Sequence, residues 1–123
     1  MLIPILHFCG DCEDAIRFYE NAFATKAENV EYRDDNKIVH AEMIIRGQRI
    51  FLNDRFGNKN KTLDCAMHMI ITFNDVDELL ECYGNLKEGG SIIDPFRETP
   101  YSPLVGNFMD KFGVLWGFMA VSQ

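Results

Sequence analysis

The sequence predicts an α+β fold in which two βαβββ modules pair into a curved mixed sheet that encloses a cavity. Both halves of the chain open with an apolar strand that is followed by an acidic amphipathic helix. Equivalent features then recur at nearly constant spacing: Asp11 and Asp75 are 64 residues apart, and the hairpin glycines Gly47 and Gly113 are 66 apart. An internal repeat of this length indicates a paired architecture. Strands with helices on one face indicate the α+β class.

Length and composition place the chain among small globular domains. Its 123 residues suit a single domain made of two modules, about 1–55 and about 65–123, with a linker over about 54–64. The net charge is −7, and the basic residues are scattered. We therefore expect neither nucleic acid nor a membrane surface as partner. No apolar run approaches the ~20 residues of a membrane helix, and the basic start of a signal peptide is missing, so we expect a cytoplasmic protein.

The first module shows both the helical spacing of apolar residues and the period-two alternation of a strand. Residues 3–9 are predicted to form a strand, and Asp11 is the expected N-cap of the following helix. A weaker strand is predicted at 26–32, the range 38–45 alternates with period two, and 49–53 returns as its hairpin partner. The helix is indicated by an apolar stripe at helical spacing, formed by Cys12, Ala15, Ile16, Tyr19, Ala22 and Phe23.

The second module follows the same order. A strand is predicted at 66–73, then a helix capped by Asn74 or Asp75. The pair Gly89-Gly90 is expected to end that helix. Range 96–103 contains two prolines and a tyrosine and is predicted to be an irregular loop. The remaining predicted strands are 91–95, 104–109 and 114–121.

Three stretches carry a resemblance to a known family. They are the opening, with Pro4 and FCGDCEDAIRFY at 8–19, the HAEMIIRG stretch at 40–47, and the DKFGVLW stretch at 110–116. Together they resemble the vicinal-oxygen-chelate superfamily, which is the glyoxalase, bleomycin-resistance and dioxygenase fold, and within it the PhnB-like branch. The resemblance covers the whole chain. It implies a small-molecule ligand in a cavity between the curved sheets, and often a homodimer.

The resemblance also implies where metal ligands would lie. In metal-using members, four inward ligands come from the first and last strands of the two modules. These positions fall on Pro4, at or near Phe51, on His68, and on Gly117, where a glutamate would be expected. Only His68 can bind a metal through its side chain, whereas a catalytic zinc normally takes three protein ligands. We therefore expect the usual metal site to be lost, with no cofactor, and keep a divalent metal as the alternative.

His40 and Glu42 form the other candidate constellation. They share one face of the predicted strand 38–45, and apolar side chains occupy the opposite face. If the apolar face meets the helix, both residues point into the cavity with His68. Two histidines and a carboxylate can ligate iron or zinc, and a His–Glu pair can transfer protons. A structural or ligand-positioning pair is the third interpretation.

The remaining cavity lining is expected to be apolar and aromatic, as in most small-molecule sites. Asn53 and Thr72 would add polar groups, and Tyr101 would lie over the opening. By alternation, His7 and Trp116 are expected to face the helices. The predicted apolar lining, which could equally be plain core, consists of Leu6, Phe8, Phe51, Ile70, Phe108 and Phe118.

Cys9 and Cys12 have C-x-x-C spacing. A zinc site would need a second pair at similar spacing, which Cys65 and Cys82 do not provide because they are 17 residues apart. A thioredoxin-like pair would need a parallel strand–helix context, which the sequence does not indicate. Cys12 also falls on the apolar stripe, so we expect buried structural thiols and leave a redox role open.

These observations predict a PhnB-like protein that binds an unidentified small molecule without a metal, and they leave catalysis open. One alternative is a metal-dependent lyase, isomerase or dioxygenase that uses His68 with His40 and Glu42. Another is the sequestration of a bleomycin-type drug, which needs an acidic, aromatic groove. The predicted ligand-binding residues are His68, His40, Glu42, Phe8, Phe51, Asn53, Tyr101 and Phe108.

Overall fold

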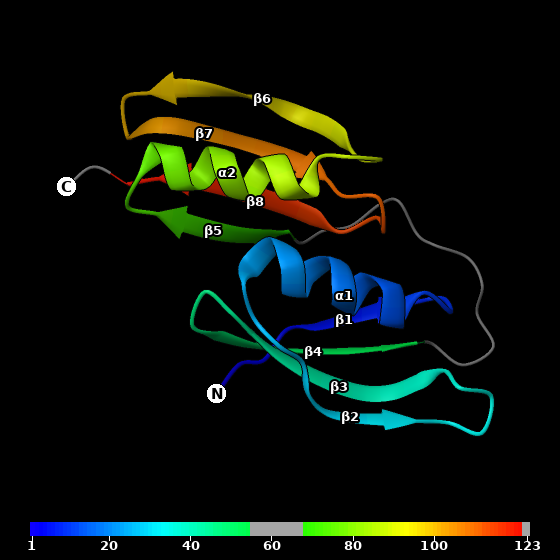
Figure 1. Cartoon of the computed structure of the whole chain (residues 1–123). Helices are drawn as coiled ribbons and strands as arrows, with labels where there is room; N and C mark the ends of the chain where they lie inside the picture. The colour runs from blue at the N-terminus through cyan, green and yellow to red at the C-terminus, as the bar shows by residue number, and fades with distance from the viewer. Residues whose placement is uncertain (55–67, 122–123) are drawn as a thin grey trace. The chain divides into compact units, whose positions relative to one another are not determined.

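The computed structural model describes residues 1–54 and 68–121 of the chain. These residues belong to two compact units, 1–61 and 62–123. Each unit contains one four-stranded sheet and one helix, in the order βαβββ (Figure 1). The predicted α+β fold of two such modules is therefore confirmed. The predicted linker lies outside the described residues apart from Asp54, which ends a strand.

The sheet of the first unit has the order β1-β4-β3-β2. Strand β1 runs parallel to β4, and the other two pairings are antiparallel. The parallel pairing is possible because a helix and two strands separate β1 from β4 in the chain. The elements of this unit are β1 (Ile5–Phe8), α1 (Cys12–Phe23), β2 (Glu28–Tyr32), β3 (Ile38–Ile45) and β4 (Gln48–Asp54).

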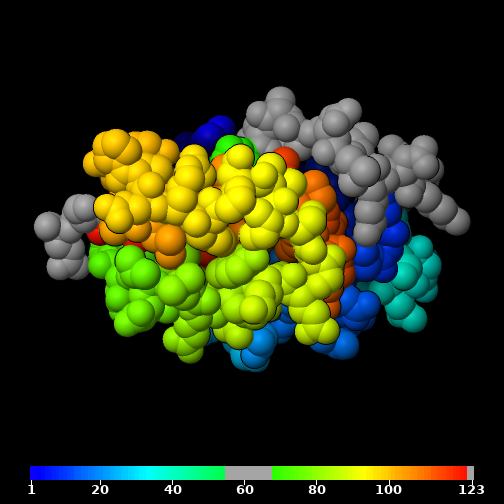
Figure 2. All heavy atoms as spheres, turned by 90° about the horizontal axis from the view of Figure 1, so that it is seen from above, coloured from blue at the N-terminus to red at the C-terminus, as the bar shows by residue number. Residues whose placement is uncertain are grey.

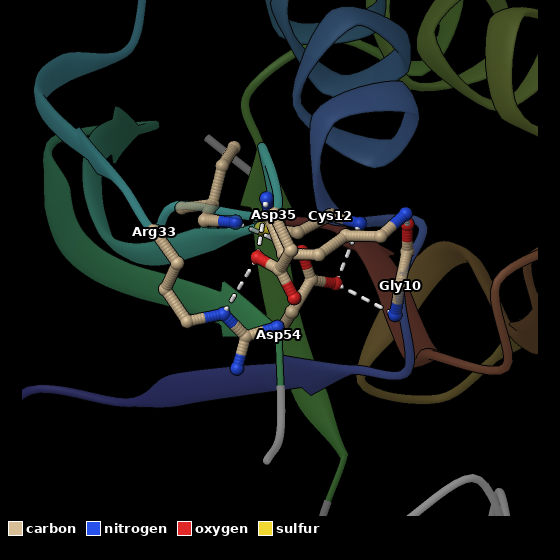
Figure 3. Close-up of polar contacts among 7 residues, drawn as sticks. Gly10, Cys12, Arg33, Asp35 and Asp54 are labelled. Carbon is tan, nitrogen blue, oxygen red and sulfur yellow. Dashed lines mark hydrogen bonds and ion pairs between the residues drawn. The ribbon is translucent and has the colours of Figure 1, made fainter. Parts of the chain in front are cut away.

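The buried carboxylate of Asp54 holds the start of helix α1. Its Oδ1 accepts hydrogen bonds from the backbone N–H groups of Gly10 (2.8 Å) and Cys12 (3.1 Å), as Figure 3 shows. Its Oδ2 accepts a third from the N–H of Ile38, at 3.1 Å. Asp11 occupies the N-cap position, as predicted, but its side chain makes no cap hydrogen bond. A residue from the last strand of the unit satisfies the helix start instead.

The second unit repeats this arrangement with the sheet order β5-β8-β7-β6. Its helix is capped as predicted, because the Asp75 side chain accepts a hydrogen bond from the N–H of Asp77 at 3.1 Å. The predicted loop at 96–103 is wrong, since strands continue through most of it and form a hairpin. The elements are β5 (Met69–Phe73), α2 (Val76–Leu86), β6 (Ser91–Thr99), β7 (Ser102–Met109) and β8 (Leu115–Ala120).

Strand β6 forms the edge of the second sheet, which explains how it tolerates Pro95. Three shifts of register interrupt its pairing with β7. Figure 2 shows the yellow residues of β6 beside the green helix α2 on one face of this unit. The rings of Tyr83 and Phe96 join the two elements, with their centroids 4.8 Å apart. Neither helix in the part of the chain that the structure describes could cross a membrane.

Candidate functional site

Each sheet has one face that packs against its own helix and one that this helix does not cover, here called the helix-free face. In the first unit, the fully buried Ala41, Met43 and Leu52 lie on the helix side. Neighbouring residues of a strand point to opposite faces, and directly paired residues share a face. The pair of Glu42 with Phe51 therefore lies on the helix-free face.

A hydrogen-bonded network connects three side chains on this helix-free face. Glu42 Oε2 lies 2.8 Å from His40 Nε2, and Glu42 Oε1 accepts a hydrogen bond from Arg49 Nη1 at 2.6 Å. The three side chains are partly exposed, at 16% for Glu42, 32% for His40 and 36% for Arg49. The ring of Phe51 meets the His40 ring edge-on, with 4.9 Å between centroids. The network is thus preoriented beside an aromatic surface.

The hydrogen bonds make Glu42 a persistent anion. The hydrogen bond from His40 contributes most to lowering its pKa below the ordinary value of 4.5, and the bonds from Arg49 and Asn29 act in the same direction. Desolvation opposes them. Glu42 is therefore ionised at neutral pH and orients both His40 and Arg49.

His7 and Asn53 add a second polar pair to the same face. They are directly paired between β1 and β4, and His7 Nδ1 lies 2.7 Å from Asn53 Oδ1. The prediction that His7 faces the helix is therefore wrong. Its neighbours Leu6 and Phe8 take the helix side, since residues alternate along β1.

The helix-free face of the second unit has its polar groups around Gly117. Gly117 in β8 pairs with Ile70 on one side and with Asn107 on the other. A Cβ atom built on Gly117 would lie 2.7 Å from Asn107 Oδ1 and 3.2 Å from His68 Cδ2. Asn107 Nδ2 donates a 2.7 Å hydrogen bond to Asp94 Oδ2. His68, just before β5, thus lies close to an amide that Asp94 orients.

Four of the predicted apolar lining residues lie on the helix side of their sheets, which corrects their expected orientation. Phe8 is only 2% exposed and contacts the ring of Tyr19 in α1, with 6.4 Å between centroids. Phe108 is 1% exposed, and its ring lies 4.9 Å from that of Tyr83 in α2. Leu6 shares the face of Phe8, and Phe118 is fully buried. Only Phe51 and Ile70 of the predicted set lie on helix-free faces.

Tyr101 and Thr72 occupy different surroundings. Tyr101 lies in the tight turn between β6 and β7 and is 65% exposed. Thr72 pairs with Met119, which places it on the same helix-free face as Ile70. Trp116 lies on the helix side as expected, and its indole Nε1 donates a 2.9 Å hydrogen bond to Asp110 Oδ2.

Three of the four positions where the resemblance puts metal ligands lack a side chain that could bind a metal. Phe51 presents a ring and Gly117 has no side chain. The register places Ile5 opposite Phe51, so neither Ile5 nor the preceding Pro4 supplies a side-chain ligand there. Within residues 1–54 and 68–121, no three His, Cys, Asp or Glu side chains gather closely enough to hold a metal ion.

Cys9, Cys12 and Cys82 are free thiols. Cys12 and Cys82 are buried, whereas Cys9 is half-buried. Burial, together with the nearby carboxylates of Asp54 and Asp11, raises the pKa of the Cys12 thiol to about 12. Because the thiolate is the reactive form, Cys12 is a poor nucleophile. Cys65 lies outside the described residues.

Sequence reasoning missed three residues of these two faces and assigned a fourth to the wrong face. Arg49 could have been found, because it shares the alternation of Phe51 and Asn53 along β4. His7 was identified but assigned to the wrong face. Asp94 and Asn107 carried no local signal, because their pairing depends on a hairpin that passes through the range read as a loop.

Comparison with known proteins agrees with the fold. The sequence model of the Glyoxalase/Bleomycin resistance protein/Dioxygenase superfamily matches residues 2–118. Protein YjdN of Escherichia coli (strain K12) is 28% identical in an alignment that covers 99% of this chain and 96% of YjdN.

Two solved structures are similar over almost their whole length. The PhnB protein from Bacillus cereus has a TM-score of 0.87 at 27% identity, and the match covers 98% of each chain. Protein PA1353 from Pseudomonas aeruginosa has a TM-score of 0.88 at 23% identity, covering 100% of this chain and 98% of that one, and it supports the fold alone. Because the family model spans nearly the whole sequence, the chain belongs to the glyoxalase/bleomycin resistance protein/dioxygenase superfamily, in its PhnB-like branch.

Proposed function

We propose that this protein binds a small organic molecule without a metal, on the helix-free faces of its sheets. The observation that carries the proposal is Glu42, held between His40 and Arg49 beside the ring of Phe51. Partly exposed ion pairs add little to stability, so folding alone gives small reason for this network. Preoriented polar groups next to aromatic surface are the usual composition of a small-molecule site.

The network favours a ligand group that accepts hydrogen bonds. Both carboxylate oxygens of Glu42 are engaged within the protein. Arg49 has five N–H donors and directs one nitrogen to Glu42, which leaves donors for a ligand. A carbonyl or carboxylate group beside an apolar or aromatic body is therefore the complementary chemistry on this face.

Acid–base catalysis is the second candidate function, and it has an observation of its own. Glu42 Oε2 fixes His40 through Nε2, which leaves Nδ1 as the ring nitrogen for proton exchange. A carboxylate that orients a histidine is a recurrent element of acid–base sites. The metal-dependent alternative and drug sequestration gain no comparable support from the contacts of either unit.

The enclosed cavity, a homodimer and a cytoplasmic location complete the proposal. Light scattering at micromolar concentration tests the homodimer, and a monomeric mass would contradict it. Metal analysis of untagged protein tests the metal-independent part. Stoichiometric zinc, nickel or iron that is lost on His68→Ala substitution would overturn it.

Ligand binding itself is tested by NMR with benzoate, which carries a carboxylate on an aromatic ring. Titration into ¹⁵N-labelled protein should shift the backbone amides of His40 and Phe51, and Arg49→Ala should weaken this response. Arg33→Ala is the matched control, because Arg33 pairs with Asp35 in the β2–β3 turn. Benzoate shifts that are absent, or equal in the two variants, would contradict the anchoring role of the network.

A further inference from the structure

The second helix-free face contains a glycine where the strand is otherwise bulky. Gly117 lies inside β8, and a glycine within a strand often marks the close approach of another group. Here that group is Asn107, whose Oδ1 would be 2.7 Å from a Cβ at this position. Atoms of His68 and Ile70 would each be 3.2 Å from it. Any side chain at position 117 would therefore displace the amide of Asn107.

The direction of the Asn107 amide follows from its partner. The carboxylate of Asp94 can only accept a hydrogen bond, so Nδ2 of Asn107 must face it, at 2.7 Å. Oδ1 consequently points away from Asp94 and lies over Gly117, near His68. The protein thus presents an amide oxygen whose orientation is fixed by a second residue.

The strand register shows which residues of the first unit occupy the positions equivalent to Asn107 and Gly117. Glu42 pairs with Phe51 there, and Asn107 pairs with Gly117 in the same way here. The β1 neighbour of Phe51 is Ile5, and the β5 neighbour of Gly117 is Ile70. Asn107 thus occupies the position in the second unit that Glu42 occupies in the first. Gly117 occupies the position of Phe51, so the second unit has no side chain where the first has an aromatic ring.

Asn107 and Asp94 share one chemistry, since both present oxygens that accept hydrogen bonds. Asn107 Oδ1 faces Gly117, the carboxylate of Asp94 holds the other end of the same amide, and the His68 ring approaches Gly117 with Cδ2. The nearby cation Arg97 directs a guanidinium N–H to the backbone carbonyl of Pro95, at 3.3 Å. The carboxylate therefore gives the cluster a preference for positive charge.

We propose that this cluster binds a primary amino group of the ligand and that Asn107 is the residue that determines this specificity. The inference rests on the proposed small-molecule function and adds the chemical class of the group that the second unit recognises. Ile70, which is 62% exposed, offers apolar surface next to the amine position. Gly117 is required because it lets the amide lie against β8.

The test compares benzylamine, benzyl alcohol and benzoate, which share one ring and differ in the polar group. Each is titrated at pH 8 into ¹⁵N-labelled protein, with the Gly117 backbone amide and the Asn107 side-chain amide as reporters. Benzylamine should shift both reporters at lower concentration than benzyl alcohol, and benzoate should leave them unchanged. Asn107→Ala should weaken benzylamine binding about fivefold, the effect of one hydrogen bond worth about 1 kcal/mol.

Asn21→Ala, an asparagine change at an exposed position of α1, is the matched control and should leave the Gly117 response unchanged. Asp94→Asn keeps the shape but removes the charge, so it should reduce the preference for the amine over the alcohol. Equal or stronger shifts with benzoate, or an unchanged response in Asn107→Ala, would overturn the inference. If benzoate shifts the amides of His40 and Phe51 but benzylamine does not shift that of Gly117, the amine-binding inference is rejected and the proposed function stands. If none of the three probes causes shifts, the proposed function is rejected as well.

Discussion

Asp54 and Gly10 lie 44 residues apart in the sequence, yet Oδ1 of Asp54 accepts a 2.8 Å hydrogen bond from the backbone N–H of Gly10. The same carboxylate accepts from the N–H groups of Cys12 and Ile38. The end of the last strand in the unit thus holds the first turn, the start of α1 and the start of β3. The helix start depends on a tertiary contact and not on a local cap.

Asp54→Ala should destabilise the protein strongly. The substitution removes the acceptor of three backbone N–H groups, and Asp54 is only 2% exposed. A buried donor without a partner costs about 1–3 kcal/mol, so we expect a loss of about 3 kcal/mol or more in the free energy of unfolding. Urea unfolding followed by far-UV circular dichroism measures it. Asp34→Ala, in the exposed turn after β2, should stay within about 0.5 kcal/mol of wild type.

Two glycine-to-alanine substitutions in the second unit should have opposite effects. A Cβ on Gly106 would lie 2.7 Å from ring atoms of Phe96 and 3.0 Å from its Cα, so Gly106→Ala should cost about 1–3 kcal/mol through overpacking. Gly84 is inside α2 with no neighbouring atom within 4 Å of a built Cβ, so Gly84→Ala should stabilise by up to about 1 kcal/mol. The same urea titrations compare both. A neutral Gly106→Ala would mean that the Phe96 ring can move freely.

The two-module fold could be predicted because its signals are local. The alternation along β3 correctly placed Ala41 and Met43 on the helix side and His40 and Glu42 opposite. The helices followed from apolar stripes, and Asp75 was correctly identified as a cap. Each of these inferences needed only residues within one or two turns of chain.

The errors have two sources: an expected cavity lining that was preferred to local alternation, and residues that depend on a partner far along the chain. Phe118 follows Trp116 by two residues, so period-two alternation already placed both on the helix side. Phe118, Phe8 and Phe108 were assigned to the cavity because an aromatic lining was expected there, although their alternation indicated the helix side. The amide of Asn107 and the capping by Asp54 depend on pairings across 13 and 42 residues, which no local pattern specifies.

The contribution of Glu42 to stability should depend on pH in a defined direction. The hydrogen bond from His40, followed by that from Arg49, lowers its pKa below 4.5. A carboxylate whose pKa is lowered by folding stabilises the protein above its unfolded-state pKa, and this contribution is lost as the pH falls through the folded-state pKa. Glu42→Gln should therefore lower the melting temperature by a small amount at pH 7, as expected for a partly exposed network, and the difference from wild type should vanish in acid.

Differential scanning fluorimetry of wild type and Glu42→Gln between pH 3 and pH 7 measures this difference. Glu81→Gln, an exposed position in α2, provides the control and should show no comparable pH dependence. A difference between wild type and Glu42→Gln that persists unchanged at pH 3 would show that the charge of Glu42 contributes nothing.

The C-x-x-C pair should react unequally with iodoacetamide. Burial raises the pKa of Cys12 to about 12, so at pH 8 only about one molecule in ten thousand carries its thiolate. Cys9 is half-buried and should be alkylated first. Tandem mass spectrometry of the peptide that contains both residues separates the two sites, and in urea both should react. Alkylation of Cys12 as fast as Cys9 in the folded protein would contradict a buried structural thiol and would favour a redox role for the pair.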